Sequence, residues 1–234
     1  MKQLIRVENL HKRYGSTVAL ADISLEIPKG VIVGLLGPNG SGKTTLIKIL
    51  MGLLSDYEGQ VVIDGVAPGE ETNQIIAYLP DKSHIPTWFN ANDIINFFAD
   101  FYGDFDKNRV YEMLDSMEIP LKKKMKSLSR GMQEKVGLAL VMSRRAKLYI
   151  LDEPLGAVDP ASRDFIMETI LKSYHEESSI LLSSHIISDI ESVLDRAIFL
   201  KKGEIIMHDE ADQIRSENQK SLDELFREVF RNVR

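Results

Sequence analysis

Residues 37–44 constrain this chain more than any other segment. They read Gly-Pro-Asn-Gly-Ser-Gly-Lys-Thr and fit the pattern G-x-x-x-x-G-K-[ST], in which glycines let the backbone fold tightly and aim successive N–H groups at phosphate oxygens. A continuous apolar run, Val31–Leu36, precedes the loop, and a helical pattern over Thr45–Leu50 follows it. Since the N-terminus of a helix adds partial positive charge to such a loop, the sequence predicts a nucleotide-binding site.

The tasks expected of single loop residues follow from the chemistry of a triphosphate. Lys43 is expected to reach the β and γ phosphates of ATP, and the hydroxyl of Thr44 to ligate Mg²⁺. The other candidate ATP contacts lie in the same loop and at the start of the helix: Gly37, Pro38, Asn39, Gly40, Ser41, Gly42 and Thr45.

A second motif is an apolar strand that ends in two carboxylates. Residues 148–151 are apolar, and Asp152 and Glu153 follow directly. In an α/β sheet the carboxyl end of such a strand lies beside the phosphate loop. We therefore expect Asp152 to hold Mg²⁺, directly or through water, and Glu153 to act as general base toward the attacking water.

Expected strands alternate with expected helices, which predicts an α/β fold with a helical subdomain. Short strands are expected within 1–85, and further strands at 148–151, at 180–183 and up to Met207. Helices are expected from Asn90, which is capped together with Asp93, then over 109–117, 132–144, 161–175 and 187–194, and in an amphipathic tail. We expect one domain, 1–234, with a catalytic core at 1–85 and 146–210, a helical subdomain at 86–145 and a helical tail at 211–234.

Composition narrows the class of protein. With 234 residues and 44% hydrophobic content the chain can bury the core of one domain. The net charge of −6 argues against nucleic acid as a partner, and the lack of cysteine excludes disulfides. No apolar stretch approaches the ~20 residues of a membrane helix, and the charged N-terminus does not read as a signal peptide. A cytoplasmic protein is expected, whose membrane role would need a partner.

Further motifs resemble those of ATP-binding-cassette ATPases. Residues 128–133, Leu-Ser-Arg-Gly-Met-Gln, resemble the signature motif of that family, and residues 156–159 resemble its D-loop. His185 lies where its switch histidine lies, and Tyr14 matches the aromatic residue that stacks on adenine. The motifs follow the family's order, and the resemblance covers about residues 4–210.

The resemblance implies a fold, partners and a mechanism. It implies a phosphate-loop NTPase with a RecA-like core sheet, an N-terminal antiparallel β-subdomain and a helical signature subdomain. Two cassettes, identical or related, would pack head to tail, so that Ser129 and the N–H of Gly131 cap the γ phosphate bound to the other copy. Asp159 is expected at the nucleotide and His185 at the γ phosphate. Separate membrane permease subunits would place the chain on the inner face of the cell membrane.

The chain departs from the family pattern at several positions. Arg130 and Met132 replace a glycine and a glutamine of the signature, a variant that resembles exporter-type cassettes. Arg130 could face outward or contact phosphate. Asp81 occupies the place of the Q-loop glutamine, and we expect it to reach Mg²⁺ or the lytic water through an intervening water.

Two further segments have an open interpretation, and the first of them follows Asp81 closely. An aromatic stretch is expected to be mostly core, with Trp88 or Phe89 as candidates for a docking groove: Trp88, Phe89, Phe97, Phe98, Phe101, Tyr102 and Phe105. A lysine cluster is expected to be a solvated loop face, with lipid headgroups or a partner as the alternative: Lys122, Lys123, Lys124 and Lys126.

Three functions compete to explain these motifs. The leading hypothesis is the ATP-hydrolysing subunit of a transporter, an exporter in particular. The alternative is a soluble cassette ATPase without transport, of the iron–sulfur assembly or translation type, although the translation type normally carries two cassettes in one chain. A phosphate-loop kinase or GTPase does not explain residues 128–133 together with His185.

Overall fold

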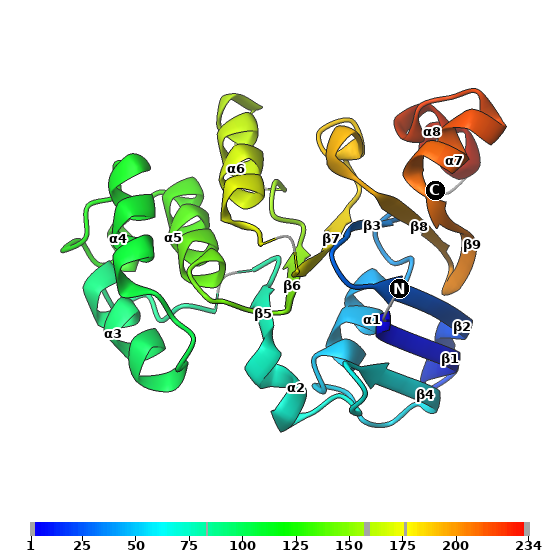
Figure 1. Cartoon of the computed structure of the whole chain (residues 1–234), viewed down its shortest axis with the longest axis horizontal. Coiled ribbons are helices and arrows are strands. Elements are labelled where there is room, and N and C mark those ends of the chain that lie inside the picture. Colours follow the sequence, from blue (N-terminus) through cyan, green and yellow to red (C-terminus); the bar gives the residue numbers. More distant parts are fainter. Residues whose placement is uncertain (1–2, 83, 157–159, 176, 232–234) are drawn as a thin grey trace.

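A six-stranded, mostly parallel sheet lies at the centre of the computed structural model, which describes residues 3–82, 84–156, 160–175 and 177–231 (Figure 1). The strands follow the order β5-β6-β7-β3-β8-β9, and β9 runs antiparallel to β8. Every residue of β3, β6 and β7 is buried, as expected for apolar strands covered on both faces. The strand bounds are β3 (Ile32–Leu36), β5 (Ile76–Leu79), β6 (Leu148–Asp152), β7 (Ser179–Ser184), β8 (Arg196–Lys201) and β9 (Glu204–Glu210).

A second, antiparallel sheet has the order β2-β1-β4 among the described residues. It consists of β1 (Gln3–Tyr14), β2 (Thr17–Pro28) and β4 (Glu58–Ile63). The first two strands are 12 residues long each, longer than the short strands expected from the sequence. The register of β1 shifts between Val7 and Leu10, where Asn9 has φ +48°. Such a bulge interrupts the alternation by which a long strand is recognised.

The helix after the phosphate loop is packed between the two sheets. α1 (Lys43–Leu50) buries Leu46, Ile47, Ile49 and Leu50. These side chains share one core with residues of β1, β2 and β4 and with residues of β3, β6, β7 and β8. Because both sides of α1 are packed, the loop at its N-terminus is held firmly at the edge where the parallel strands end.

Three helices lie together at the end of the molecule away from the antiparallel sheet (Figure 1). They are α3 (Ala91–Phe101), α4 (Lys107–Ser116) and α5 (Arg130–Met142). Asn90 caps α3 and accepts from the N–H of Asp93, as predicted, and Ser129 caps α5. The remaining elements are α2 (Glu70–Ile75), α6 (Pro160–Ser173), the 3₁₀ turns Met125–Ser127 and Glu191–Val193, α7 (Ala211–Asn218) and α8 (Leu222–Phe230).

Arg144, directly after α5, ties the helices to the central sheet. Its guanidinium, which is buried, donates to Asp104 (2.9 and 3.1 Å) and to the backbone oxygens of Gln74 and Ile76. It also lies 3.9 Å from the centre of the Tyr102 ring. This buried guanidinium charge is tolerated because a carboxylate, two backbone oxygens and an aromatic ring surround it.

Some expectations were wrong in detail. The helix expected over 187–194 is instead a series of turns that ends in the 3₁₀ turn Glu191–Val193. Ile187 and Ile190 are both buried, and their backbone groups are joined by an i to i+3 hydrogen bond of 3.0 Å. The apolar spacing was read as a helix, although successive turns satisfy it equally well. The expected tail helix is α8, and α7 precedes it.

The aromatic stretch was expected to be mostly core, but part of it faces solvent. Trp88 is 66% exposed, Phe97 56% and Phe101 69%, whereas Phe89, Phe98 and Phe105 are partly buried against the core. Helical spacing alone cannot distinguish an inner face from an outer one when both carry aromatic residues. Within the described ranges, no helix has the length and apolar character needed to cross a bilayer.

Candidate nucleotide site

A cavity of about 280 Å³ surrounds the phosphate loop at the edge where β3 and β6 end. The structure brings most of the predicted site residues together around it. Its lining consists of loop residues 39–45 together with Tyr14, Thr17, Val18, Ala19, Asp81, Asp152 and Glu153. Thr17, Val18 and Ala19 were missed by the sequence reasoning, since they carry no chemical signature and reach the site only through the hairpin of β1 and β2.

Glycines of the loop are required by its backbone path. Gly42 has φ +113°, and a Cβ atom on it would lie 2.7 Å from the backbone oxygen of Ala19. A Cβ atom on Gly37 would lie 2.4 Å from the backbone oxygen of Leu200. Larger side chains would push the loop away from β2 and β8, so the tight turn predicted from the sequence is present.

Lys43 is held inside this loop. Its Nζ atom donates to the backbone oxygens of Gly37 (2.6 Å) and Pro38 (3.3 Å) and lies 3.5 Å from Oε1 of Glu153. Burial lowers the pKa of the ammonium, and the carboxylates of Glu153 and Asp152 oppose that shift. The positive charge is therefore fixed between the loop and the end of β6.

Ser183 of β7, a residue that the sequence reasoning missed, bonds to the carboxylate of Asp152 and to the backbone of Glu153. The Ser183 hydroxyl donates to Oδ1 of Asp152 at 2.5 Å and accepts from the backbone N–H of Glu153 at 3.1 Å. Asp152 is 2% exposed, and burial raises its pKa while the hydrogen bond from Ser183 opposes the rise. A serine in a fully buried strand next to the acidic strand is the signal that could have identified it.

Glu153 and His185 form a pair at the ends of β6 and β7. Nδ1 of His185 lies 2.8 Å from Oε2 of Glu153. Glu153 has φ +52°, a left-handed conformation that a residue with a side chain adopts at a cost. Its Oε1 atom is buried and has no hydrogen-bond partner among the described residues, although Lys43 lies within ion-pair distance. This strained, half-satisfied carboxylate is the candidate general base of the sequence analysis.

Tyr14 lies at the outer rim of the cavity. It is 48% exposed, and the ammonium of Lys12 lies 5.1 Å from the centre of its ring. An exposed aromatic face at the rim of a phosphate cavity is suited to stacking on a planar base.

Ser129 and Gly131 lie apart from this cavity, since neither belongs to the described residues that line it. The Ser129 hydroxyl caps α5 and accepts from the N–H of Met132 at 3.3 Å. A Cβ atom on Gly131 would meet nothing within 4 Å. Arg130 faces solvent and pairs with Glu134 at 3.3 Å, so it lies along the helix. Asp159 lies outside the described residues.

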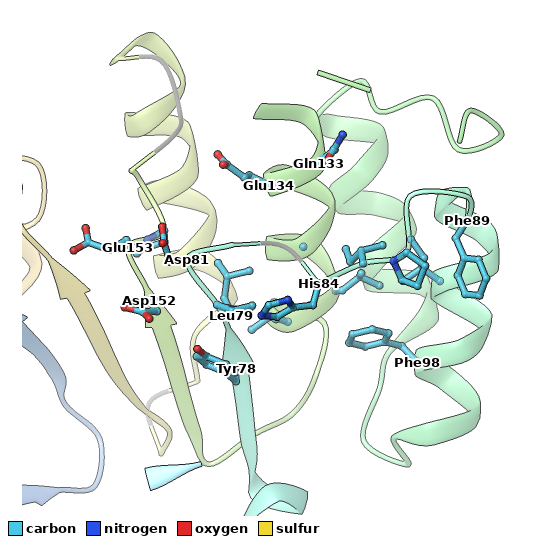
Figure 2. A pocket seen from close by; sticks show the side chains of 18 of the residues that line it. Tyr78, Leu79, Asp81, His84, Phe89, Phe98, Gln133, Glu134, Asp152 and Glu153 are labelled. Atoms are coloured by element: carbon cyan, nitrogen blue, oxygen red, sulfur yellow. The ribbon is translucent and has the colours of Figure 1, made fainter. Parts of the chain in front are cut away.

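A larger cavity of about 370 Å³ lies between the end of β5 and α5 (Figure 2). Asp81, Asp152 and Glu153 lie at one end of it, and His84, Phe89 and Phe98 lie toward the helices. Asp81 lines this cavity and the nucleotide cavity as well. Asp152 and Glu153 also line both cavities, so the two hollows meet at these three carboxylates.

The donor set fits a nucleotide with a hard divalent cation. Ser41 has a buried hydroxyl without a hydrogen-bond partner in the loop, which a phosphate oxygen would satisfy. The Thr44 hydroxyl and the Asp152 carboxylate are oxygen ligands of the kind Mg²⁺ prefers. In the part of the chain that the structure describes, no group of three histidine, aspartate or glutamate side chains could hold a metal ion. Protein oxygens would therefore supply only part of its shell.

Comparisons with known proteins agree with this geometry. The family model described as ABC transporter matches residues 20–156. The uncharacterized ABC transporter ATP-binding protein YdbJ of Bacillus subtilis is 33% identical, with 86% of this chain and 68% of that protein covered. The lantibiotic transport ATP-binding protein SrtF of Streptococcus pyogenes is 32% identical over 95% of this chain and 96% of that protein.

A solved structure, titled as an ATP-binding subunit of an ABC transporter, gives a TM-score of 0.86 at 28% identity and covers 97% of this chain and 99% of that chain. These likenesses extend over the phosphate loop, the acidic strand and the helices between them. The chain belongs to the ABC transporter family, as an ATP-binding cassette that hydrolyses ATP.

Proposed function

We propose that this chain is the ATPase subunit of an exporter, that it acts as a dimer of cassettes, and that separate permease subunits carry the substrate. The observation that supports the proposal is the division of the site. Lys43 of the phosphate loop lies beside Asp152 and Glu153 in one cavity, and His185 pairs with Glu153, whereas the signature residues begin α5 outside the lining of that cavity.

Roles within one copy follow from the contacts. The loop N–H groups, Lys43 and the Ser41 hydroxyl bind phosphate oxygens, and Tyr14 stacks on adenine. Bound Mg²⁺ would neutralise charge on the transferred phosphoryl group and would be held by Thr44, by Asp152 and, through water, by Asp81. Glu153 accepts the proton of the attacking water, and His185 orients Glu153 through their 2.8 Å contact.

The signature residues complete the site of a second copy. Ser129 and Gly131 lie at the N-terminal turn of α5, a helix of 13 residues, and among the described residues no atom lies within 4 Å of a Cβ atom placed on Gly131. A glycine there keeps the helix start open to a ligand from outside the chain, and the helix N-terminus favours an anion. We propose that this ligand is the γ phosphate of ATP bound to the partner cassette, with Asp159 at the same interface.

The transport role rests on the relatives and on the helical region. SrtF is named as a lantibiotic transport protein, and another relative, LnrL of Bacillus subtilis, as a linearmycin resistance protein. Both names concern the handling of antibiotic compounds, which supports export. Residues 86–145 would act as a subdomain that senses the permease, and the chain would lie at the inner face of the cell membrane.

Complementation between two inactive variants tests the shared site. The first variant, Lys43→Ala, lacks the lysine of the phosphate loop. The second variant, Ser129→Arg, keeps that lysine but has a blocked signature. Each variant alone has no intact site. A 1:1 mixture that exchanges partners restores about a quarter of the sites, because half of the dimers are mixed and each of these has one intact site. A mixture as inactive as its components would contradict the shared site, while wild-type activity of Ser129→Arg alone would contradict any role for the signature.

Co-purification tests the permease. The tagged Glu153→Gln chain, solubilised from its native membranes in mild detergent with ATP, should bring down an integral protein in a fixed ratio. Lys43→Ala serves as the matched control, since it preserves the helical region but binds ATP poorly. Recovery of cytoplasmic proteins without an integral partner would support a cassette that does not transport.

A further inference from the structure

Two segments that are far apart in sequence form one surface beside α3. The backbone N–H of Met125 donates to the oxygen of Phe89 at 2.7 Å, and that of Lys126 donates to the oxygen of Thr87 at 3.0 Å. Asn90 and Lys124 form an antiparallel bridge. The loop that carries Trp88 is therefore pinned against the lysine segment 122–126 by main-chain hydrogen bonds.

The side chains of this surface point into solvent. Trp88 is 66% exposed, and four neighbouring lysines are exposed as well: Lys122, Lys123, Lys124 and Lys126. Within the described residues, none of these lysine side chains forms an ion pair or a hydrogen bond. We call these five residues the Trp88–lysine surface. It combines an uncovered aromatic ring with four uncompensated positive charges.

The neighbouring cavity does not account for this exposure. Phe89 and Phe97 line the cavity between β5 and α5 (Figure 2), but Trp88 and the lysines do not belong to its lining. On α3, Phe97 and Phe101 stack with their ring centres 6.0 Å apart, and both are exposed. The rings of Trp88 and Phe101 therefore lie outside the lining of the hollow that a docked protein segment would fill.

Electrostatics favours an anionic lipid surface over a single acidic side chain. The lysines lie on a connecting segment without a carboxylate partner, and their combined field suits a diffuse negative charge. Tryptophan favours the boundary between headgroups and acyl chains, where its ring is apolar and its N–H remains hydrated. The net charge of −6 opposes this only weakly, because at physiological salt charges beyond about 8 Å are largely screened.

We propose that the Trp88–lysine surface binds anionic lipid headgroups directly and orients the cassette on the membrane. This contact goes beyond the proposed function, since it requires neither the permease nor ATP. Lysine ammonium groups contact lipid phosphates, and the Trp88 ring enters the headgroup region.

Trp88 reports on the contact by itself, because it is the single tryptophan of the chain. The full-length protein is mixed with vesicles of phosphatidylglycerol or of phosphatidylcholine, and its fluorescence and co-sedimentation are measured together. We expect a blue shift of the Trp88 emission and co-sedimentation with phosphatidylglycerol, and neither with phosphatidylcholine. Raising the salt concentration should weaken both signals, because the attraction is electrostatic.

A charge-matched pair of variants locates the contact. Lys122→Gln, Lys123→Gln, Lys124→Gln and Lys126→Gln together should lower the partition coefficient at least tenfold, since each lysine near an anionic surface contributes on the order of fivefold. The control replaces four exposed lysines elsewhere by glutamine: Lys48, Lys172, Lys202 and Lys220. It should bind as the wild type does, and both variants should keep their circular dichroism and their ATP binding.

Four results would overturn the proposal. The first is a wild-type protein that does not sediment with phosphatidylglycerol vesicles. The second is equal loss of binding in both lysine variants, which would reflect total charge. The third is sedimentation without a Trp88 shift, which would assign the membrane contact to another face. A shift that occurs only when permease is added would assign the surface to a protein partner.

Discussion

Replacing Ser183 by alanine removes a hydroxyl that contacts the carboxylate of Asp152 and the backbone N–H of Glu153, although that N–H keeps its 3.2 Å bond to the backbone oxygen of Ser183. It takes away the 2.5 Å hydrogen bond to Asp152 and the 3.1 Å bond from the N–H of Glu153. A hydrogen bond to a charged group contributes about 1.5–3 kcal/mol. Burial already raises the pKa of Asp152 and the bond from Ser183 opposes that rise, so its carboxylate becomes harder to keep ionised when the donor is lost.

Ser183→Ala should lower the turnover number by more than its loss of folding stability can explain. We expect Ser183→Ala to lower kcat about 10- to 100-fold, which corresponds to about 1.4–2.7 kcal/mol of lost transition-state stabilisation. The Mg²⁺ concentration needed for half-maximal activity should rise, since Asp152 is the proposed ligand. The assay is steady-state ATP hydrolysis with Mg²⁺ titrated at saturating ATP, alongside the free energy of unfolding from urea denaturation.

Ser184 provides a matched control in the same strand. It is also buried, but its hydroxyl bonds to the backbone of Ile186 and contacts neither carboxylate. Ser184→Ala should lose comparable stability and keep kcat within about threefold of the wild type, a change of less than 1 kcal/mol in the barrier. Equal losses of kcat in the two variants, or a wild-type kcat and Mg²⁺ requirement in Ser183→Ala, would refute the positioning role.

Three further predictions concern other parts of the molecule. Two lysine partners lower the pKa of Asp64 below its usual 3.8, so Asp64→Asn should cost about 1 kcal/mol of stability at pH 7. The difference should shrink as the pH falls below 3.8 in urea titrations and should be absent well below that value. Asp81→Gln should raise basal ATP hydrolysis, because the side chain longer by one methylene can reach Mg²⁺ or the lytic water without an intervening water. An unchanged or lower rate would contradict this explanation. Gly37→Ala places a Cβ atom 2.4 Å from the backbone oxygen of Leu200. It should lower the free energy of unfolding, followed by thermal denaturation, by about 1–3 kcal/mol and should weaken ATP binding. Gly103→Ala is the control, since a Cβ atom there meets open space, and it should change neither property.

Much of the site could be predicted from the sequence because its motifs are contiguous. The phosphate loop and the acidic pair each lie within one short segment, and parallel strands bring their carboxyl ends to the same edge. Ser183 escaped prediction because its partners are 30 and 31 residues away in sequence. Its role depends on the register of β6 against β7.

The parts of the fold that were mispredicted share a physical cause. The turns over 187–194 and the exposed rings of Phe97 and Phe101 follow a helical apolar spacing whose meaning depends on neighbouring elements. The length of β1 was hidden by a bulge at Asn9, and β2 contains a residue of similar left-handed conformation, Asp22. In each case the local sequence pattern is compatible with more than one structure, and packing against neighbouring elements decides which structure forms.

Sedimentation of the Glu153→Gln chain with Mg²⁺ and ATP tests the central claim most directly. If ATP is held between the phosphate loop of one cassette and the start of α5 in another, this variant binds ATP, hydrolyses it negligibly and sediments as a dimer, which dissociates when ATP is removed. A chain that binds ATP but remains a monomer, or a wild-type monomer whose turnover does not depend on protein concentration, would contradict it.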